Sequence, residues 1–504
     1  MTEGQYIPVS QRFERDMDFI DTEKRSDSLQ FSDNANTHFV YHDMNELVDT
    51  EAGKKVLAKM ISTFNSEQKH RLEILDGYSK GINHTIFNGR KRLEKEKADH
   101  RVSHNWGGYI SNYITGYLMS KPITIGTKAV DDDEEEALAP IFEVNDSNDI
   151  DSLNFELGFD TSRYGRAFEL HYRKEDGSDI VSIIDPKDIF VIRSSDVSKD
   201  IIGAVHVPIY NDLVYMTIYT ANHVIKYEPT NQDSPTFVEQ SRKVNLYKDV
   251  PVVEWWNNRF RQGDFETEIP LIDAYDSAQS DTANYMSDLN DALLVIKGDF
   301  ESAGIDGNDL INMKSANILA LESGTDVNGK QTTMDAGYIY KQYDVAGTEA
   351  YKTRLVNDIY KLSHVPNLDD DRFFSGQSGV SMQYKMIGLE QIKSIKESFY
   401  TKALRRRYEL IGNIRQELSQ TGITADDLTF TFHTNIPQDV WAEVEKYINA
   451  NGEVSQATLM ELASFIDSSE NEKRRLAEDN ISPYATDEER QFVLRERDVN
   501  EGTE

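Results

Sequence analysis

The sequence predicts an α+β fold in which helices surround a region of short strands. From Gly165 to Asn257, short runs of alternating apolar and polar residues are separated by turns, which is typical of half-buried strands. In a later segment apolar residues recur mostly every three or four positions, which predicts a helix of roughly 40 residues, about 60 Å long, with one buried face. That face consists of Ile392, Ile395, Phe399, Leu404, Tyr408, Ile411, Ile414 and Leu418.

Chain length and composition limit the class of protein. A chain of 504 residues is too long for one ordinary core and predicts about two to four structural units. Cysteine is absent, which excludes disulfides, thiolate metal sites and cysteine nucleophiles and suits assembly in a reducing cytoplasm. No window approaches 18 consecutive apolar residues, and the N-terminus lacks the apolar core of a signal peptide. We therefore expect a soluble protein that is not exported and has no membrane partner.

The chain is strongly acidic. It carries 54 Lys and Arg against 88 Asp and Glu, a formal net charge of −34. This charge argues against a protein that grips nucleic acid over its whole surface, and so against a sequence-specific DNA binder. Two interpretations remain: the acidity provides solubility, or DNA passes this protein without binding, because a wall that repels phosphates offers little resistance to sliding.

The first third of the chain is predicted to be mainly helical. Residues 1–60 are polar and charged, so we expect them to contribute little to a hydrophobic core. Helical patterns follow at Phe64–Gly81 and Asn105–Met119, and Pro122–Thr127 is predicted to be a strand. The six acids Asp131–Glu136 indicate a solvated loop or the start of a helix that ends near Val144.

The middle of the chain is predicted to be rich in strands. Ala167–Arg173 and Ile180–Asp185 flank a turn at Glu175, Asp176 and Gly177, which predicts a hairpin. Further strands are predicted at Ile189–Ile192, Ala204–Ile209, Val214–Tyr219, His223–Tyr227 and Val250–Trp255. Together they predict a β-rich subdomain beside the helices.

Two helices then bracket a small mixed region. Gly263–Asn290 is helical but polar on most sides, so we expect it to pack against copies of itself or a partner helix. Strands are predicted at Leu293–Lys297 and Gly337–Gln342. A second helix, Thr348–His364, ends before Pro366.

The C-terminal third follows the long helix. Leu428–Thr434 is predicted to be a strand. Helices are predicted at Asp439–Asn449, Ser455–Ile466 and Glu470–Glu478. Residues after about 481 are charged and predicted to be disordered.

The order of motifs between Val365 and Gln420 is distinctive. VPNL is followed by an acid-rich loop, SGxSGV, QYK, GLE and a long helix that carries RRRY. This order resembles the portal proteins of tailed bacteriophages, and more narrowly the portal family of long-tailed phages of Gram-positive bacteria. Ser381 stands where the family usually has alanine after SGV.

A second, independent match lies at residues 104–125, HNWGGYISNYITGYLMSKPITI, which resembles the early helix of the family and its GxPI-like strand. Ser120 and Lys121 precede Pro122, where the family often has glycine. The order and spacing of these blocks agree with the family from about residue 40 to about residue 480.

The resemblance implies a portal fold with a mixed α/β wing, a helical stem, a small α/β clip, a long wing helix and a helical C-terminal crown. The implied parts are an N-terminal polar segment (1–60), wing (61–262), stem helix (263–292), clip (293–346), second stem helix (347–364), tunnel loop (365–381), long wing helix with returning strand (382–436), crown (437–482) and tail (483–504).

The resemblance also implies a function. Such a protein forms a ring, usually a dodecamer and sometimes a 13-mer when recombinant, at one capsid vertex of the virion, through which double-stranded DNA is packaged and ejected. The implied partners are the large terminase subunit that hydrolyses ATP, the scaffolding and major capsid proteins, and a head completion or adaptor protein. Rival interpretations are another virion structural protein, such as a capsid or connector protein, and an ATP-driven packaging enzyme.

The predicted tunnel loop supplies the main candidate site. If it were an ordinary surface loop, it would not need adjacent phenylalanines; in a ring, they could anchor the loop while the acids face the bore. The candidate residues are Asp369, Asp370, Asp371, Arg372, Phe373, Phe374, Gly376 and Gly379.

A basic cluster on the long helix is the second candidate. It consists of Lys402, Arg405, Arg406 and Arg407. Ion pairing with acids of a neighbouring segment is its commoner explanation. The alternative is contact with DNA phosphates.

Other motifs predict no catalysis, cofactor or metal. Gly324–Lys330 fits G-x-x-x-x-G-K, but Gln331 stands where a phosphate-binding loop needs Ser or Thr, and a strand rather than a helix is predicted to follow. His100 and His104 have ligand spacing but lack the HExxH context, so surface or capping roles are expected.

Overall fold

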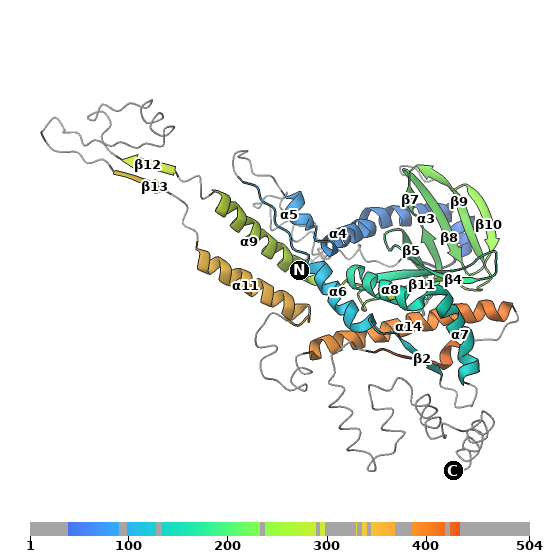
Figure 1. The fold of residues 1–504 in the computed structure, drawn as a ribbon. Coiled ribbons are helices and arrows are strands. Elements are labelled where there is room, and N and C mark those ends of the chain that lie inside the picture. The colour runs from blue at the N-terminus through green and yellow to red at the C-terminus, as the bar shows by residue number, and fades with distance from the viewer. Residues whose placement is uncertain are drawn as a thin grey trace, which may run out of the picture. The chain divides into compact units, whose positions relative to one another are not determined.

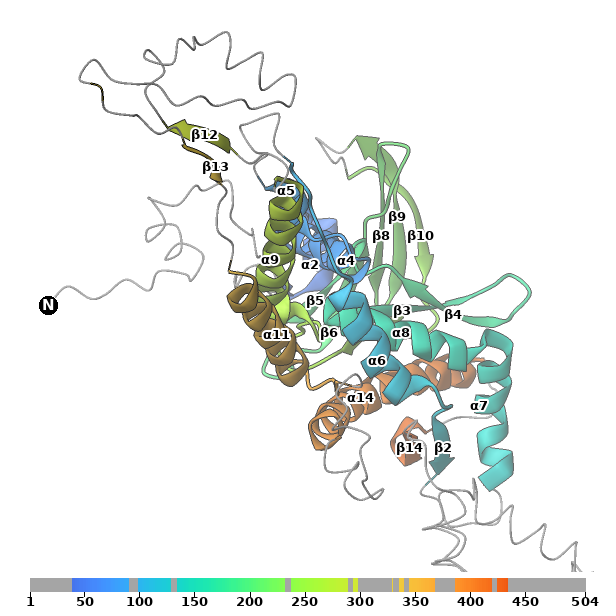
Figure 2. The same cartoon turned by 60° about the vertical axis from the view of Figure 1, so that its left-hand side comes forward.

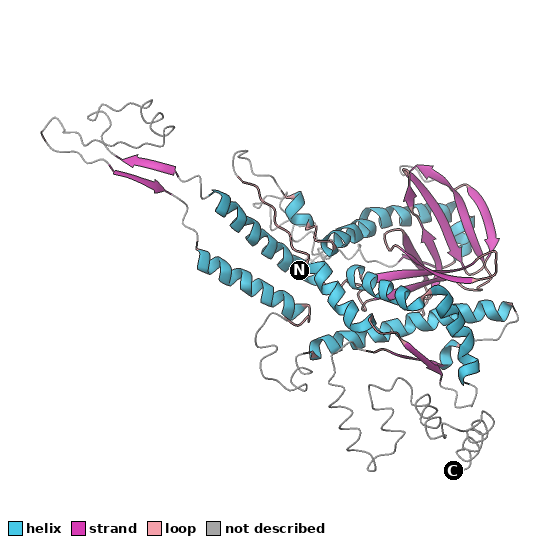
Figure 3. Ribbon diagram, in the orientation of Figure 1, coloured by secondary structure: helices cyan, strands magenta, loops and turns pink. Residues whose placement is uncertain are grey.

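The computed structural model describes residues 39–89, 98–127, 134–231, 237–288, 293–297, 329, 335–339, 344–367, 386–418 and 424–433. These all belong to one compact unit; a second unit, residues 374–384 and 436–504, lies outside them, as do the predicted crown and tail. Helices and strands both contribute to the described unit, which confirms the α+β class (Figure 1 and Figure 3).

The helices agree with most predicted positions. They are α2 (Met44–Asp49), α3 (Glu51–Thr63), the π-helical segment η4 (Phe64–Lys69), α4 (His70–Ser79), α5 (His84–Asn88), α6 (Trp106–Met119), α7 (Glu134–Asn148), α8 (Ile150–Tyr164), α9 (Ile269–Asp288), α11 (Val345–Leu362) and α14 (Ile387–Glu417). Short 3-10 turns lie at Glu266–Glu268 and Ala425–Asp427.

The strands form four separate sheets. They are β1 (Phe39–Tyr41), β2 (Thr124–Thr127), β3 (Arg166–Arg173), β4 (Asp179–Ile184), β5 (Ile189–Ser194), β6 (Ile201–His206), β7 (Ile209–Tyr210), β8 (Leu213–Thr220), β9 (His223–Asn231), β10 (Glu239–Val244), β11 (Val252–Trp256), β12 (Leu293–Lys297), β13 (Asp335–Ile339) and β14 (Leu428–Thr431).

The largest sheet has the order β1-β5-β6-β8-β9-β10, and β7 pairs with β8. A three-stranded sheet has the order β11-β3-β4 and contains the predicted hairpin, in which Phe168 pairs with Ile184. The predicted β-rich subdomain is therefore two sheets.

The two sheets are stacked in layers, because alternate side chains of β5 point to opposite faces of the large sheet. Phe190 and Ile192 of β5 face the helices α2 and α3, whereas Ile189 and Val191 face the three-stranded sheet. The opposite face of that sheet, which includes Trp255, packs against α8 and α14. A strand buried on both faces reads as a continuous apolar run, as β5 does. The order is thus helices, large sheet, small sheet and helices (Figure 2).

One sequence expectation needs correction. Residues 1–60 were expected to contribute little core, but Met44, Leu47 and Leu57 are buried against the large sheet. A segment that is polar on average can still form an amphipathic helix with one apolar face, and composition alone does not reveal that face. The strand predicted at Leu428, β14, pairs antiparallel with β2 in a separate two-stranded sheet, with Phe430 opposite Ile125.

The long helix is shorter than expected and its buried face shifts. α14 has 31 residues, about 46 Å at 1.5 Å per residue. Its C-terminal half follows the prediction, and Tyr408, Ile411 and Ile414 are buried. In the N-terminal half Ile395 is 51% exposed and Lys396 is buried instead. The shift arises because the Lys396 ammonium bonds Asp264, with Nζ 2.7 Å from Oδ2.

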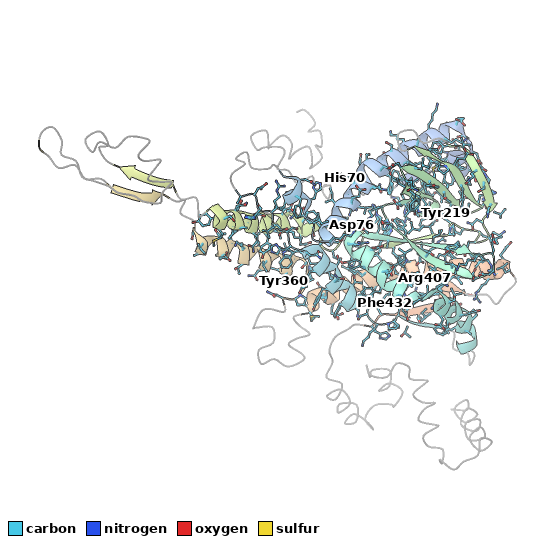
Figure 4. The ribbon with its side chains drawn as sticks, turned by 45° about the horizontal axis from the view of Figure 1, so that its top comes forward. His70, Asp76, Tyr219, Tyr360, Arg407 and Phe432 are labelled. Carbon is cyan, nitrogen blue, oxygen red and sulfur yellow. The ribbon has the colours of Figure 1, made fainter. Side chains whose placement is uncertain are left out.

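A buried ion pair fixes the middle of α14. Arg407 is fully buried, and its Nε lies 3.1 Å from both carboxylate oxygens of Glu169 on β3. Its Nη1 donates to Asn154 of α8 (2.8 Å) and its guanidinium lies over Trp255. Figure 4 labels Arg407. Burial alone would raise the pKa of Glu169, but the Arg407 charge and hydrogen bonds from Arg407 and His171 lower that pKa to about 2.

We predict that Glu169→Gln lowers the free energy of unfolding by about 3–5 kcal/mol, because it leaves Arg407 buried without a countercharge. An unfolded glutamate has a pKa of about 4.3, so the folded pair stabilises the chain above that pH and loses its contribution as pH falls towards 2. The variant should lack this part of the acid dependence. Urea unfolding followed by tryptophan fluorescence at pH 7, 4 and 3 measures both effects.

Arg405→Met is the matched control, because Arg405 is exposed two residues away on the same helix. It should change stability by less than about 0.5 kcal/mol. A Glu169→Gln variant as stable as this control would contradict the assigned role of the pair.

Candidate functional site

The two helices that bracket the hairpin β12–β13 in sequence lie side by side (Figure 1 and Figure 2). α9 is the predicted polar helix and α11 its partner. Lys352 of α11 is buried, and its Nζ lies 2.7 Å from Glu349 Oε1 and 3.3 Å from Gln279 Oε1 on α9. Leu355 and Ile359 supply the apolar part of the contact face of α11. The pair therefore combines a narrow apolar strip with a buried polar link.

An irregular segment, residues 98–104, runs along the polar face of α9; we call it the strap. Three α9 side chains, each four residues after the last, accept hydrogen bonds from alternate backbone N–H groups of the strap. The bonds are His104 N to Asp276 Oδ1 (3.2 Å), Val102 N to Ser280 Oγ (2.9 Å) and His100 N to Asn284 Oδ1 (2.6 Å). Asn284 Nδ2 also donates to the His100 carbonyl (3.3 Å).

The spacing of this ladder has a simple physical basis. Four residues of helix rise about 6 Å, and two residues of extended backbone span about 6.6 Å. Every fourth helix residue can therefore bond every second residue of a segment that runs antiparallel to it. The ladder satisfies backbone groups that burial would otherwise leave unpaired.

Two carboxylates, the half-buried Asp273 and the buried Asp276, anchor the N-terminal half of α9. Asp273 and Asp276 are bonded by side chains of residues 78–104, in the region that carries α4 and α5. The bonds are Tyr78 Oη to Asp273 (2.6 Å), Thr85 Oγ1 to Asp273 (2.8 Å), Asn83 Nδ2 to Asp276 (2.8 Å) and His104 Nδ1 to Asp276 (2.7 Å). Burial raises the pKa of both aspartates, and these hydrogen bonds oppose the rise. Polar contacts therefore anchor this helix in addition to its buried Ile269 and Ile272.

The predicted tunnel-loop residues Asp369, Asp370, Asp371, Arg372, Phe373, Phe374, Gly376 and Gly379 lie outside the described residues. The flanks of the loop are described. Val365 and Leu389 are both buried, and a Cβ added at Gly388 would lie 2.7 Å from Nδ1 of His364. The end of α11 and the start of α14 therefore meet at close range, which fixes the base of the loop.

The basic cluster separates into two kinds of residue. Arg407 is fully buried against Glu169, and Arg406 bonds Asp249 and the Val250 carbonyl. Ion pairing within the chain, the commoner explanation, therefore accounts for these two. Arg407 cannot reach DNA from this position. Lys402 and Arg405 are exposed.

The remaining candidates give no catalytic or metal centre in the described part of the chain. His100 and His104 bond different α9 residues, Ser287 and Asp276. No group of three or more His, Asp or Glu side chains within the described ranges could hold a metal ion. Of the Gly324–Gln331 motif, only Gly329 is described. Within the same ranges, no helix is both long enough and apolar enough to span a membrane.

The sequence analysis missed the strap and the buried cation Lys396. A signal for the strap exists, because Asp276, Ser280 and Asn284 are small polar residues at a strict four-residue interval. Lys396 had no comparable signal, since it follows Ile395 in an apparently regular amphipathic pattern.

We predict that Asn284→Ala loosens the end of the strap, because it removes both bonds to the His100 backbone. Hydrogen–deuterium exchange at the His100 amide should accelerate about five-fold, as expected for a bond of about 1 kcal/mol. Asp281→Asn, an exposed position on α9, is the control and should leave the exchange unchanged. Equal protection of the strap in both variants would argue against the ladder.

Comparisons with known proteins agree with the predicted resemblance. The model of a family described as "Phage portal protein, SPP1 Gp6-like" matches residues 59–482. The portal protein of Bacillus phage SPP1 is 21% identical over 420 residues, which cover 79% of each chain. A solved structure, the neck of an empty GTA particle computed with C6 symmetry, aligns at a TM-score of 0.39 and 11% identity, over 71% of this chain and 88% of that chain. Since the family match spans more than four fifths of the sequence, this chain belongs to the SPP1 Gp6-like family of phage portal proteins.

Proposed function

We propose that this chain forms the portal ring at one capsid vertex and that double-stranded DNA enters and leaves the capsid through the ring. The observation that carries the proposal is the family match over residues 59–482. The helix pair α9 and α11, with β12 and β13 between them in sequence, supports it. In this assignment α9 and α11 are the stem, β12 and β13 belong to the clip, and the layered sheets with α14 are the wing. Residues 39–60 join the wing, because their apolar side chains are buried in it.

The proposed mechanism is mechanical. The chain supplies no catalysis, and a separate large terminase subunit docked on the clip hydrolyses ATP. A net charge of −34 favours sliding, since DNA phosphates find few cations to hold them. The loop that begins after α11 would reach the bore with Asp369–Asp371, and its base at His364 and Gly388 would transmit its position to α14.

The proposed partners follow from this assignment. Scaffolding and major capsid proteins contact the wing during assembly in the host cytoplasm. A head completion or adaptor protein replaces the terminase once packaging ends, and the tail follows.

We predict a closed ring of about twelve chains of 57.6 kDa, roughly 690 kDa, because cyclic closure leaves no interface unsatisfied. Mass photometry gives the mass, and electron-microscopy class averages viewed down the axis give the subunit number. Rings of thirteen from recombinant protein would agree. A strictly monomeric species by light scattering, at high concentration and moderate salt, would contradict the assignment.

We predict that the triple variant Asp369→Lys, Asp370→Lys and Asp371→Lys stalls DNA during packaging or ejection, while rings still form. Twelve loops would gather about 36 carboxylates, whose mutual repulsion is screened over roughly 8–10 Å. Their replacement by lysine would turn a repelling ring into one that binds phosphates. The measurement is in vitro packaging into procapsids that carry the variant ring.

The matched control places the same change of charge elsewhere: Glu175, Asp200 and Glu228, all exposed, each replaced by lysine. This variant should package at the parental rate. Gly376→Val with Gly379→Val should impair translocation through stiffness alone. If the loop variants also package full-length DNA at the parental rate, the loop does not line the constriction.

A further inference from the structure

Two cations of α14 have no ion-pair partner in the described part of the chain, unlike the other cations of this helix. Five of its seven basic residues pair with acids of this chain: Lys393 with Glu390 and Glu397, Lys396 with Asp264, Arg406 with Asp249, Arg407 with Glu169 and Arg415 with Glu143. Within the described residues Lys402 and Arg405 form no ion pair, although both are exposed on a chain of net charge −34. Lys402 lies over the Phe399 ring, 5.4 Å from its centroid.

These two cations line a groove of about 640 Å³ between α14 and β14. Ser394, Ser398 and Thr401 contribute hydroxyl groups along the helix side. The strand side consists of residues 430–432, including Phe432, which Figure 4 labels. No residue of β2 lines the groove, and within the described residues β14 pairs with β2 alone.

The lining favours an extended acidic peptide. An unpaired strand edge is a template for an added strand, whose backbone bonds give affinity and whose side chains give specificity. In the groove Lys402 and Arg405, which form no ion pair with any described residue, provide charge complementarity, and Glu397 is already paired with Lys393. Double-stranded DNA fits less well, because firm binding needs many phosphate contacts and this groove offers two free cations.

We propose that this groove binds an extended acidic segment of a second copy of this chain, the neighbour in the ring. Charge identifies the occupant: with 88 acids against 54 basic residues, a neighbouring copy brings the complementary charge. The inference rests on the proposed function, since ring closure places a second copy beside each wing. The groove then contributes to cohesion between wings.

Photo-crosslinking tests the occupant directly. The chain has no cysteine, so Thr401→Cys creates a unique thiol in the groove, which a benzophenone maleimide labels. After irradiation of assembled rings, a denaturing gel should show species of two or more chains. Mass spectrometry should map the link to a peptide rich in Asp and Glu. Links confined to one chain, or links to DNA when DNA is added, would overturn the proposal.

Charge reversal tests the two cations. Lys402→Glu with Arg405→Glu, in the Thr401→Cys background, should lower the yield of inter-chain links at least ten-fold and make rings dissociate at lower salt. Both positions are exposed, so the melting temperature should stay within about 2 °C of the parent. The control, Lys174→Glu with Lys226→Glu, reverses two other exposed cations and should keep the parental yield.

The outcomes separate the two proposals. Parental rings with links only inside each chain, or a charge-reversed variant that crosslinks at the parental yield, overturn the groove assignment alone. A parental chain that never forms rings overturns the ring as well.

Discussion

Buried cations of α14 hold the described unit together. Arg407 ties the helix to β3 through Glu169 and to α8 through Asn154, and Lys396 ties it to Asp264 in the loop before α9. One helix is thereby bonded both to the sheets and to the segment from which the stem-like helix starts. Because an unpaired charge in such surroundings is costly, each bond constrains the position of α14 more strictly than apolar packing alone. The layered sheets and the helix pair are therefore both attached to α14.

The helix pair is held by a different kind of contact. α9 buries carboxylates and hydroxyls, and its partners are the strap, residues 98–104, and the side chains of residues 78–85. Hydrogen bonds are directional, so they fix the rotation and the height of α9, whereas a purely apolar face would permit it to slide. The polar character that makes α9 marginal alone is thus the basis of its attachment.

Charge is distributed unevenly between the interior and the surface of the chain. Most cations of α14 form ion pairs with acids of the same chain, so they contribute little positive charge to the surface. The surplus of acids remains available to the solvent and, in the proposed ring, to DNA and to neighbouring copies. Lys402 and Arg405 are the exceptions on this helix among the described residues, and both line the groove between α14 and β14.

The sequence by itself determined the α+β class, the family and the positions of most elements. Period-2 runs located the strands from β3 to β11 except β10, and the motif order from VPNL to RRRY indicated a portal protein, because these signals are local. Only the tertiary structure decided what each element contacts. The pairing of β14 with β2, the burial of Lys396 in place of Ile395, the division of the basic cluster and the strap on α9 all join residues more than 100 positions apart. Periodicity shows which face of a helix is apolar, but a distant carboxylate decides which cation that face must bury.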